Sequence, residues 1–214
     1  MKTALIIGAG GTGSLLVGAI TQSFDVIIAD GDTYEDKNKT RQPLTETGEN
    51  KANVVADVFG KNKSVEPIPH YLMGGEGIET DIVLSCVDSN EGRNAARQIA
   101  MKNECPAIFM QNEAWNPMAF LYLPQYDNTF LCPFTRYSLD KLESSREFTC
   151  GGIQVDEDEG GQSGLANLAA AGLGVMILHS LSQNNEDNYI MEAKNIPWTV
   201  WKKLKDVRQE TLNQ

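Results

Sequence analysis

The chain has 214 residues, and its 18 Lys and Arg against 29 Asp and Glu give a net charge of −11. That length suits one α/β domain with helices on both faces of a sheet. A surface this acidic repels nucleic acid and anionic membranes, so neither is expected as a partner.

The cysteines and the N-terminus indicate a reducing, cytoplasmic location. No two of the four cysteines form a C-x-x-C pair. The chain passes from Met1 and Lys2 directly into a short apolar run without the cleavage pattern of a signal peptide. No uninterrupted apolar run approaches membrane-spanning length, so we expect a soluble protein.

Strands and helices are predicted to alternate along the chain. In chain order the pattern predicts a strand at 3–10, a helix at 12–24, strands at 25–30 and 64–72 with a helix at 49–60 between them, a strand at 81–88, a helix at 90–103, strands at 106–112 and 118–124, and a helix at about 163–181. The apolar strands show little polar alternation, which is typical of a buried parallel sheet.

This alternation predicts an α/β fold with a doubly wound, Rossmann-like sheet. The sheet is expected to be parallel in its first half, with additional strands and helices in the C-terminal half. We expect one nucleotide-binding domain over residues 1–182. Residues 183–214 are expected to form a C-terminal extension packed on the same domain, with a docking strand and then a helix.

A glycine motif lies between the first strand and the first helix. Gly8, Gly10 and Gly13 have the spacing G-x-G-x-x-G, in which Gly8 allows a tight turn, Gly10 lets a phosphate approach the backbone, and Gly13 lets the helix pack closely on its strand. Asp30 ends the second strand, where a carboxylate can accept hydrogen bonds from ribose hydroxyls. A glycine turn needed only for packing is the competing interpretation, but Asp30 favours a bound nucleoside.

Four further segments follow in a characteristic order. After "GAGGTG" come "DGD", "NKTRQ", "TGENK" and then "SCVDSNEGRNAARQ" at the end of a strand. Together these segments resemble the ThiF/MoeB/ubiquitin-activating superfamily of ATP-dependent adenylating proteins. The resemblance covers about residues 3–182, and its specific motifs lie between Gly8 and Arg93.

The resemblance implies a site for ATP with Mg²⁺. Gly10 and Gly11 would face the phosphates, and Asp30 would hold the ribose. Arg41 and Lys51 would be the cations at the phosphates, where the Arg41 fork of donors and the compact Lys51 charge complement each other. Taken singly, both cations could instead be solvated surface charges, the usual state of Arg and Lys.

Four other residues complete the implied site. Asn38 would orient a phosphate or the attacking group through its amide, and Gln42 would bind the nucleotide beside it. Asp88, after a parallel strand, would bind magnesium, although it could instead cap the helix that begins near Asn90. Asp32 would either bind the nucleotide or only shape the loop.

The chain also departs from the family pattern. Dimeric bacterial members carry a helix before the first strand, whose arginine reaches the ATP phosphates of the partner subunit. Here the first strand begins at about Thr3, so we expect another residue or another protein to supply that arginine. Family members often hold zinc with two C-x-x-C pairs, whereas this chain has only Cys132 in the corresponding region, and no structural zinc is expected.

Cys150 lies about where relatives that form a thioester or persulfide carry a cysteine. A nucleophilic thiol needs a cation or a helix N-terminus to lower its pKa. Arg136 and Arg146 are near it in the sequence, but the acidic run 156–159 opposes the same shift. The resemblance therefore makes Cys150 a candidate nucleophile.

Three functions are compatible with these residues. The first is an enzyme that adenylates the C-terminal carboxylate of a small ubiquitin-like or sulfur-carrier protein, acting as a homodimer or paired with a related subunit. The second is a nucleotide-binding, non-catalytic module that acts with a partner. The third is an NAD-dependent oxidoreductase, which would leave Asn38, Arg41, Lys51 and Asp88 unexplained.

Overall fold

The computed structural model describes most of the first 137 residues, the long helix that follows, and two short strands near the C-terminus. The described residues are 1–39, 42, 44, 46–62, 64–113, 116–129, 132–137, 164–183, 189–193 and 199–203.

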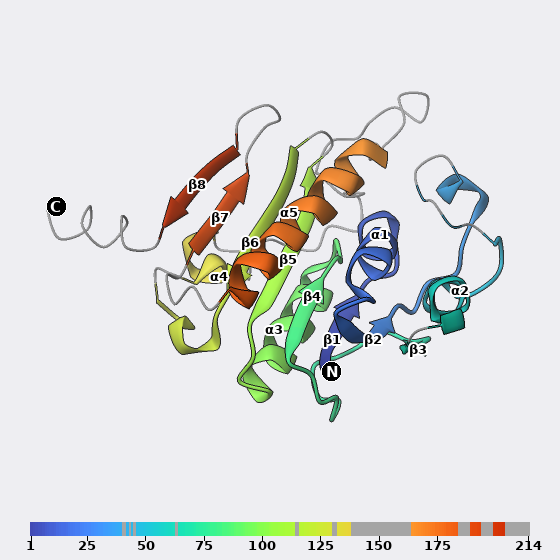
Figure 1. Cartoon of the computed structure of the whole chain (residues 1–214), viewed down its shortest axis with the longest axis horizontal. Coiled ribbons are helices and arrows are strands. Elements are labelled where there is room, and N and C mark those ends of the chain that lie inside the picture. Colours follow the sequence, from blue (N-terminus) through green and yellow to red (C-terminus); the bar gives the residue numbers. More distant parts are fainter. Residues whose placement is uncertain are drawn as a thin grey trace, which may run out of the picture.

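A six-stranded sheet forms the centre of the molecule, in the order β3-β2-β1-β4-β5-β6 (Figure 1). The strands are β1 (Lys2–Ile7), β2 (Phe24–Ala29), β3 (Val65–Ile68), β4 (Ile82–Ser85), β5 (Ala107–Glu113) and β6 (Asn116–Tyr122). The first five are parallel, and β6 returns antiparallel to β5. The five parallel strands therefore end at one common edge, the carboxyl edge.

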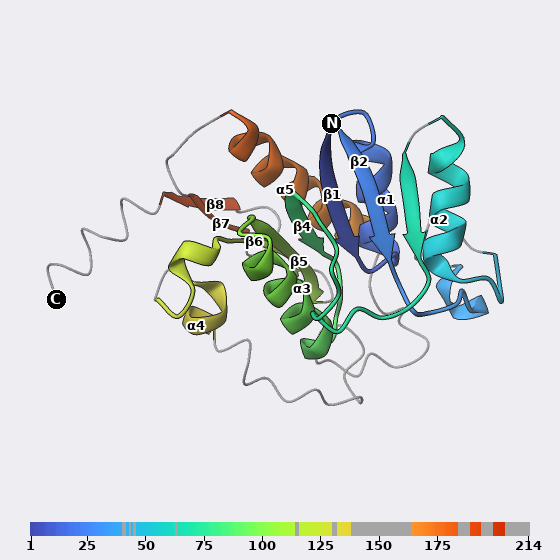
Figure 2. The ribbon, with the colours of Figure 1, turned by 90° about the horizontal axis from the view of Figure 1, so that it is seen from below.

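Helices cover both faces of this sheet (Figure 2). One face carries α1 (Gly11–Ile20), α2 (Lys51–Phe59) and α5 (Gly164–Ser182), and the other carries α3 (Asn90–Lys102) and α4 (Pro133–Tyr137). Short 3-10 helices lie at η1 (Asp36–Asn38), η2 (Gly60–Asn62) and η3 (Pro124–Tyr126).

The apolar strands are buried on both sides, which explains their lack of polar alternation. Along β1, Ala4 and Ile6 pack toward the α1 face, while Leu5 and Ile7 pack toward the α3 face. Successive side chains of a strand point to opposite faces, so each face needs its own apolar residues. The predicted α/β, Rossmann-like fold, parallel in its first half, is confirmed.

The helix layer changes sides between β1 and β4. The connections that follow β1 and β2 pass over the α1 face, whereas the connection after β4 passes over the α3 face. Neighbouring strands whose connections leave in opposite directions mark the place where α/β sheets bind ligands, at the carboxyl ends of the strands.

Both edge strands of the sheet contain proline. Pro67 lies in β3 and Pro117 in β6, and proline in a sheet is confined essentially to edge strands because it has no N–H to donate. β7 (Tyr189–Ala193) and β8 (Thr199–Lys203) form a separate antiparallel pair, with β7 beside β6. The strand predicted in this extension corresponds to β8, which pairs with β7, and the helix predicted after it lies outside the described residues.

The long helix α5 packs one side on the core, while Leu165, Leu168 and Met176 on it are exposed. By length and composition alone it could span a membrane. It lies instead against β5, β6 and α1, as Figure 1 shows. A Cβ built on Gly174 would come within 2.2 Å of the Met110 sulfur, so this glycine lets α5 approach β5 closely.

Candidate functional site

The turn from β1 into α1 depends on two glycines that touch each other. Gly8 has a φ of +97°, and a Cβ there would lie 2.9 Å from the Cys86 carbonyl oxygen. A Cβ on Gly13 would lie 1.8 Å from the Gly8 carbonyl oxygen. The chain's own packing therefore requires both glycines, as the glycine motif predicts.

Gly10 differs from these two because the surrounding chain does not need it. A Cβ built there would meet only the Gln42 side-chain nitrogen, at 3.9 Å. Gly10 is the N-cap of α1, and no side chain caps this helix end among the described residues. Uncapped N–H groups and the helix dipole favour an anion, so the space at Gly10 suits a phosphate. Gly11 is the first residue of α1 and is buried.

Asp30 lies directly beside the glycine turn at the end of β2. Its Oδ2 accepts a hydrogen bond from the Ala9 N–H at 2.7 Å, and its Oδ1 accepts one from the Asp32 N–H at 2.8 Å. Burial raises the pKa of Asp30 above its ordinary value, although these N–H groups and the charge of Lys51 act in the opposite direction. The carboxylate is thus held rigidly between the glycine loop and the "DGD" segment.

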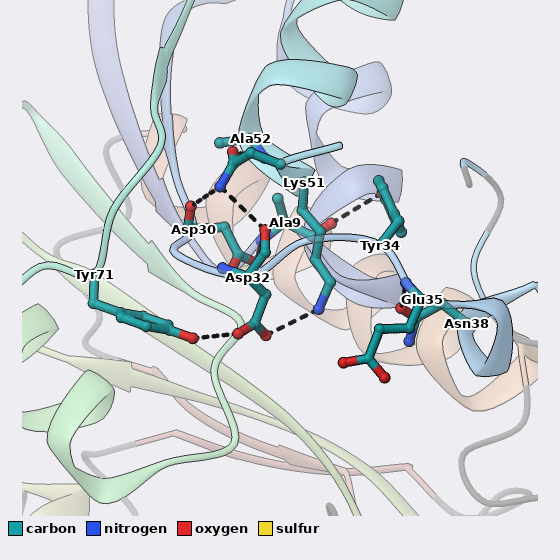
Figure 3. A network of polar contacts seen from close by, with 10 residues as sticks. Ala9, Asp30, Asp32, Tyr34, Glu35, Asn38, Lys51, Ala52 and Tyr71 are labelled. Carbon is teal, nitrogen blue, oxygen red and sulfur yellow. Dashed lines mark hydrogen bonds and ion pairs between the residues drawn. The ribbon is translucent and has the colours of Figure 1, made fainter. Parts of the chain in front are cut away.

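Lys51 points into this site rather than out to solvent. Its side-chain nitrogen lies 3.0 Å from Asp32 Oδ2, and the residue is buried (Figure 3). Asn50 fixes the start of α2 because its oxygen accepts the Ala52 and Asn53 N–H groups while its nitrogen donates to the Asp30 and Asp32 carbonyls. The interpretation of Lys51 as a solvated surface charge is therefore wrong.

Tyr71 joins the same network from the loop after β3, and sequence reasoning missed it. Its hydroxyl donates a hydrogen bond to Asp32 Oδ1, as Figure 3 shows, and its ring lies against Gly31. The hydrogen bond to Asp32, with burial and the nearby carboxylates, raises the pKa of Tyr71 to about 12. Asp32 therefore holds both Tyr71 and Lys51.

The segment after "DGD" folds into η1, whose ends bind each other. Asn38 Oδ1 accepts the Glu35 N–H at 2.8 Å, and the Glu35 side chain accepts the Asn38 N–H. Asn38 is buried, so its amide oxygen stabilises the turn. Tyr34 is also buried, and its hydroxyl donates to the Ala9 carbonyl at 3.4 Å.

Gln42 reaches the glycine loop from this segment. Its Nε2 faces Gly10, and its Oε1 is buried with no hydrogen-bond partner among the described residues. A buried amide oxygen without a partner is costly, and a bound ligand that donates to it would remove that cost. Arg41, the predicted partner cation, lies outside the described residues.

Asp88 follows β4 at the carboxyl edge. It is exposed, and Ser89 rather than Asp88 caps α3, since the Ser89 hydroxyl accepts the Gly92 N–H at 3.1 Å. The capping interpretation of Asp88 is therefore wrong. The negative charges of Asp32, Asp30 and Asp88 all act to raise the pKa of Tyr71, whose hydroxyl is bonded to Asp32.

Metal binding by the protein alone has little support within the described ranges. No group of three or more His, Cys, Asp or Glu side chains there is arranged to hold a metal ion. A Mg²⁺ ion at Asp88 would need further oxygen ligands, which nucleotide phosphates and water provide in such sites.

A second network that sequence reasoning missed lies under the first turn of α1. Thr12 donates to the Asn167 side-chain oxygen at 3.3 Å, and the Asn112 and Asn167 side-chain amides are 2.6 Å apart. All three residues are buried. They link the glycine loop to α5 and to the end of β5.

The described cysteines are not activated nucleophiles. Burial raises the pKa of Cys86, and raises that of Cys105 to about 11. Cys132 is also buried. Cys150, the candidate nucleophile, lies outside the described residues together with the acidic run that follows it.

The structure therefore brings Gly8, Gly10, Gly13, Asp30, Asp32, Lys51, Gln42 and Asp88 to one edge of the sheet. Open backbone at a helix N-terminus, a rigid carboxylate and an inward lysine fit the phosphate and ribose of a nucleotide.

Comparison with solved structures gives the same fold. The chain superposes on E. coli MccB with AMPCPP and MccA at a TM-score of 0.69 and 20% identity, covering 95% of this chain and 64% of that one. E. coli MccB with ATP gives 0.65 and 17%, covering 95% and 63%. PaaA gives 0.63 and 17%, again covering 95% and 63%.

The chain thus spans less than two thirds of the length of these proteins. No curated protein matches it. The model of the ThiF family matches residues 2–210, nearly the whole sequence. The chain belongs to the ThiF family.

Proposed function

We propose that the chain binds ATP and adenylates the C-terminal carboxylate of a small ubiquitin-like or sulfur-carrier protein. The observation that carries this proposal is the open space at Gly10. Of the three motif glycines, Gly8 and Gly13 are needed by the chain's own packing, whereas a Cβ on Gly10 would meet nothing closer than 3.9 Å. Gly10 is not required by the packing of the chain, and it lies at a helix N-terminus without a side-chain cap among the described residues. A phosphate could approach the backbone there because no described side chain is in the way.

Family membership supports ATP as the nucleotide. One MccB structure contains ATP, and another contains AMPCPP together with MccA, both on a similar fold. In this chain Asp30 would accept hydrogen bonds from the ribose hydroxyls, and the α1 N–H groups with Lys51 would bind the phosphates. Asp88 would hold Mg²⁺, which neutralises phosphate charge when it is bound.

The reaction asks the protein mainly to position groups and to stabilise charge. The carrier's carboxylate oxygen forms a bond to the α-phosphorus, and the bond from that phosphorus to the pyrophosphate oxygen breaks. Negative charge grows on the leaving pyrophosphate, so a fixed cation beside it lowers the barrier. Lys51 is poised for this because Asp32 holds it inside the site, 3.0 Å away.

The test compares two glycine variants by calorimetry with Mg-ATP. Gly10→Ala should fold normally but lose ATP binding, because its methyl group fills the phosphate space without touching the chain. Gly172→Ala is the control, since a Cβ there meets nothing within 4 Å and lies on α5. Unchanged ATP affinity in folded Gly10→Ala, or binding of NAD instead of ATP, would overturn the proposal.

Turnover is tested on the same proteins by ATP–pyrophosphate exchange with a peptide ending in Gly-Gly. We expect exchange that Asp88→Ala and Lys51→Ala abolish while folding is retained. Tight ATP binding without exchange, also with full-length carrier proteins that end in Gly-Gly, would instead identify the chain as a non-catalytic module.

A further inference from the structure

Tyr71 is an aromatic side chain at the site that has no role in the proposed binding of the phosphates or of the ribose. The residue is 64% exposed although its hydroxyl is bound to Asp32. Tyr71 follows β3, while Asp30 follows β2 and the glycine loop follows β1. Because these strands are consecutive neighbours in the sheet, the three features lie in the order Tyr71, Asp30, glycine loop along the carboxyl edge.

That order matches the order of groups in a nucleotide. The phosphates fit the glycine loop and the ribose fits Asp30, so the base lies on the far side of the ribose from the phosphates. We propose that the ring of Tyr71 is the platform on which the base of the bound nucleotide stacks. This inference rests on the proposed nucleotide site, and it adds the residue that recognises the base.

The ring is fixed in place before any ligand arrives. One side rests on Gly31, where a Cβ would come within 2.7 Å of three ring atoms. The hydroxyl is tied to Asp32, and the next residue, Leu72, is buried in the core of the α3 face. A ring held at both ends loses little conformational freedom when a ligand covers its exposed face, which favours binding.

Charge decides which part of a nucleotide this surface accepts. The Tyr71 hydroxyl is bonded directly to the Asp32 carboxylate, which lies beside the ring. A carboxylate beside the ring repels a phosphate group at that place, but it does not repel an uncharged base. Aromatic stacking does not require charge on the ligand, because every base has a π-face.

The loop that follows stiffens the same surface. Glu76 accepts the Met73 N–H at 2.6 Å and the Gly74 N–H at 2.8 Å, which closes a turn directly after Tyr71. Gly74 has a φ of +89°, a conformation that glycine adopts without strain. Tyr71 is therefore presented from a folded turn.

The experiment measures displacement of a fluorescent ATP analogue by adenosine, AMP and ATP. Tyr71→Ala should weaken all three by a similar factor of about tenfold, because the base is common to all of them. Tyr71→Phe keeps the ring on Gly31 but loses the bond to Asp32, so it should retain most of the affinity that Tyr71→Ala loses. Met101→Ala removes another exposed apolar side chain, from the C-terminal end of α3, and should change nothing.

Two results would overturn the platform. One is wild-type affinity for adenosine in Tyr71→Ala. The other is a loss confined to ATP, which would mean that Tyr71 acts on the phosphates through Asp32 and Lys51. If the wild-type chain binds no ATP, the proposed function itself fails, whereas ATP binding that Tyr71→Ala leaves unchanged rejects only the platform.

Discussion

Replacing Gly13 by alanine should destabilise the whole domain, although alanine is the better helix former. The new Cβ would lie 1.8 Å from the Gly8 carbonyl oxygen and 3.0 Å from its carbonyl carbon. Ordinary contacts to a Cβ are 3.4–4 Å, so α1 would have to move away from β1 by well over an ångström. Both atoms it meets are backbone, and no side chain can rotate to relieve the contact.

The expected magnitude follows from two opposing effects. Overpacking of this kind costs about 1–3 kcal/mol and sometimes more, and a contact with backbone belongs at the upper end. Exchange of glycine for alanine within a helix returns about 1 kcal/mol. The free energy of unfolding should therefore fall by roughly 2 kcal/mol, which lowers Tm by about 4–8 °C in a domain of this size.

The assay is urea and thermal unfolding of the variant beside a matched control. Gly172→Ala makes the same chemical change on α5, where a Cβ meets nothing within 4 Å, and should raise stability by about 0.5–1 kcal/mol. If the contact between Gly8 and Gly13 is as close as described, the glycine-to-alanine change should lower the free energy of unfolding at Gly13 and raise it at Gly172. Equal stability of Gly13→Ala and wild type would refute the close approach.

Three further predictions concern buried polar groups. Because burial raises the pKa of Asp30, its carboxylate takes up a proton at a higher pH than an ordinary aspartate does. Affinity for adenosine should therefore fall as the pH is lowered, beginning at a higher pH than an ordinary aspartate would give, and a constant affinity would contradict ribose binding by Asp30. Asn167→Leu removes the side chain that contacts the buried Thr12 and Asn112, so the free energy of unfolding measured in urea should fall by about 2–4 kcal/mol. The control Leu168→Ala changes an exposed residue and should leave this free energy unchanged. Arg97→Met removes two 2.8 Å hydrogen bonds to a largely buried Asp127 and should lower the free energy of unfolding by about 3–5 kcal/mol. Its control is Lys39→Met, which breaks an exposed ion pair with Asp36 and should leave the unfolding midpoint unchanged.

The sequence predicted the parts of the site whose position depends on neighbouring residues. Gly8, Gly13 and Asp30 lie at the ends of two strands that one helix connects, so their spacing alone places them together. Lys51 was placed at the site by the family resemblance, and in the structure α2 begins at Lys51 with Asn50 as its N-cap.

The parts that sequence reasoning missed depend on contacts between distant residues. Tyr71 meets Asp32 across 39 positions, and Asn167 meets Thr12 across 155. Neither contact follows from a local pattern, because each depends on which strand or helix lies beside which. The ends of helices and strands also differ from the prediction. The first helix ends at Ile20 instead of residue 24, because a turn must precede β2.

The short edge strand β3 bears on how these molecules behave at high concentration. An open sheet edge offers unpaired N–H and C=O groups to any passing extended chain, and this is a common route to aggregation. β3 presents only four residues there, and they include Pro67, which has no N–H, and the exposed charge of Glu66. Pairing between two such edges is therefore disfavoured, which protects the β3 edge of the sheet against self-association through strand pairing.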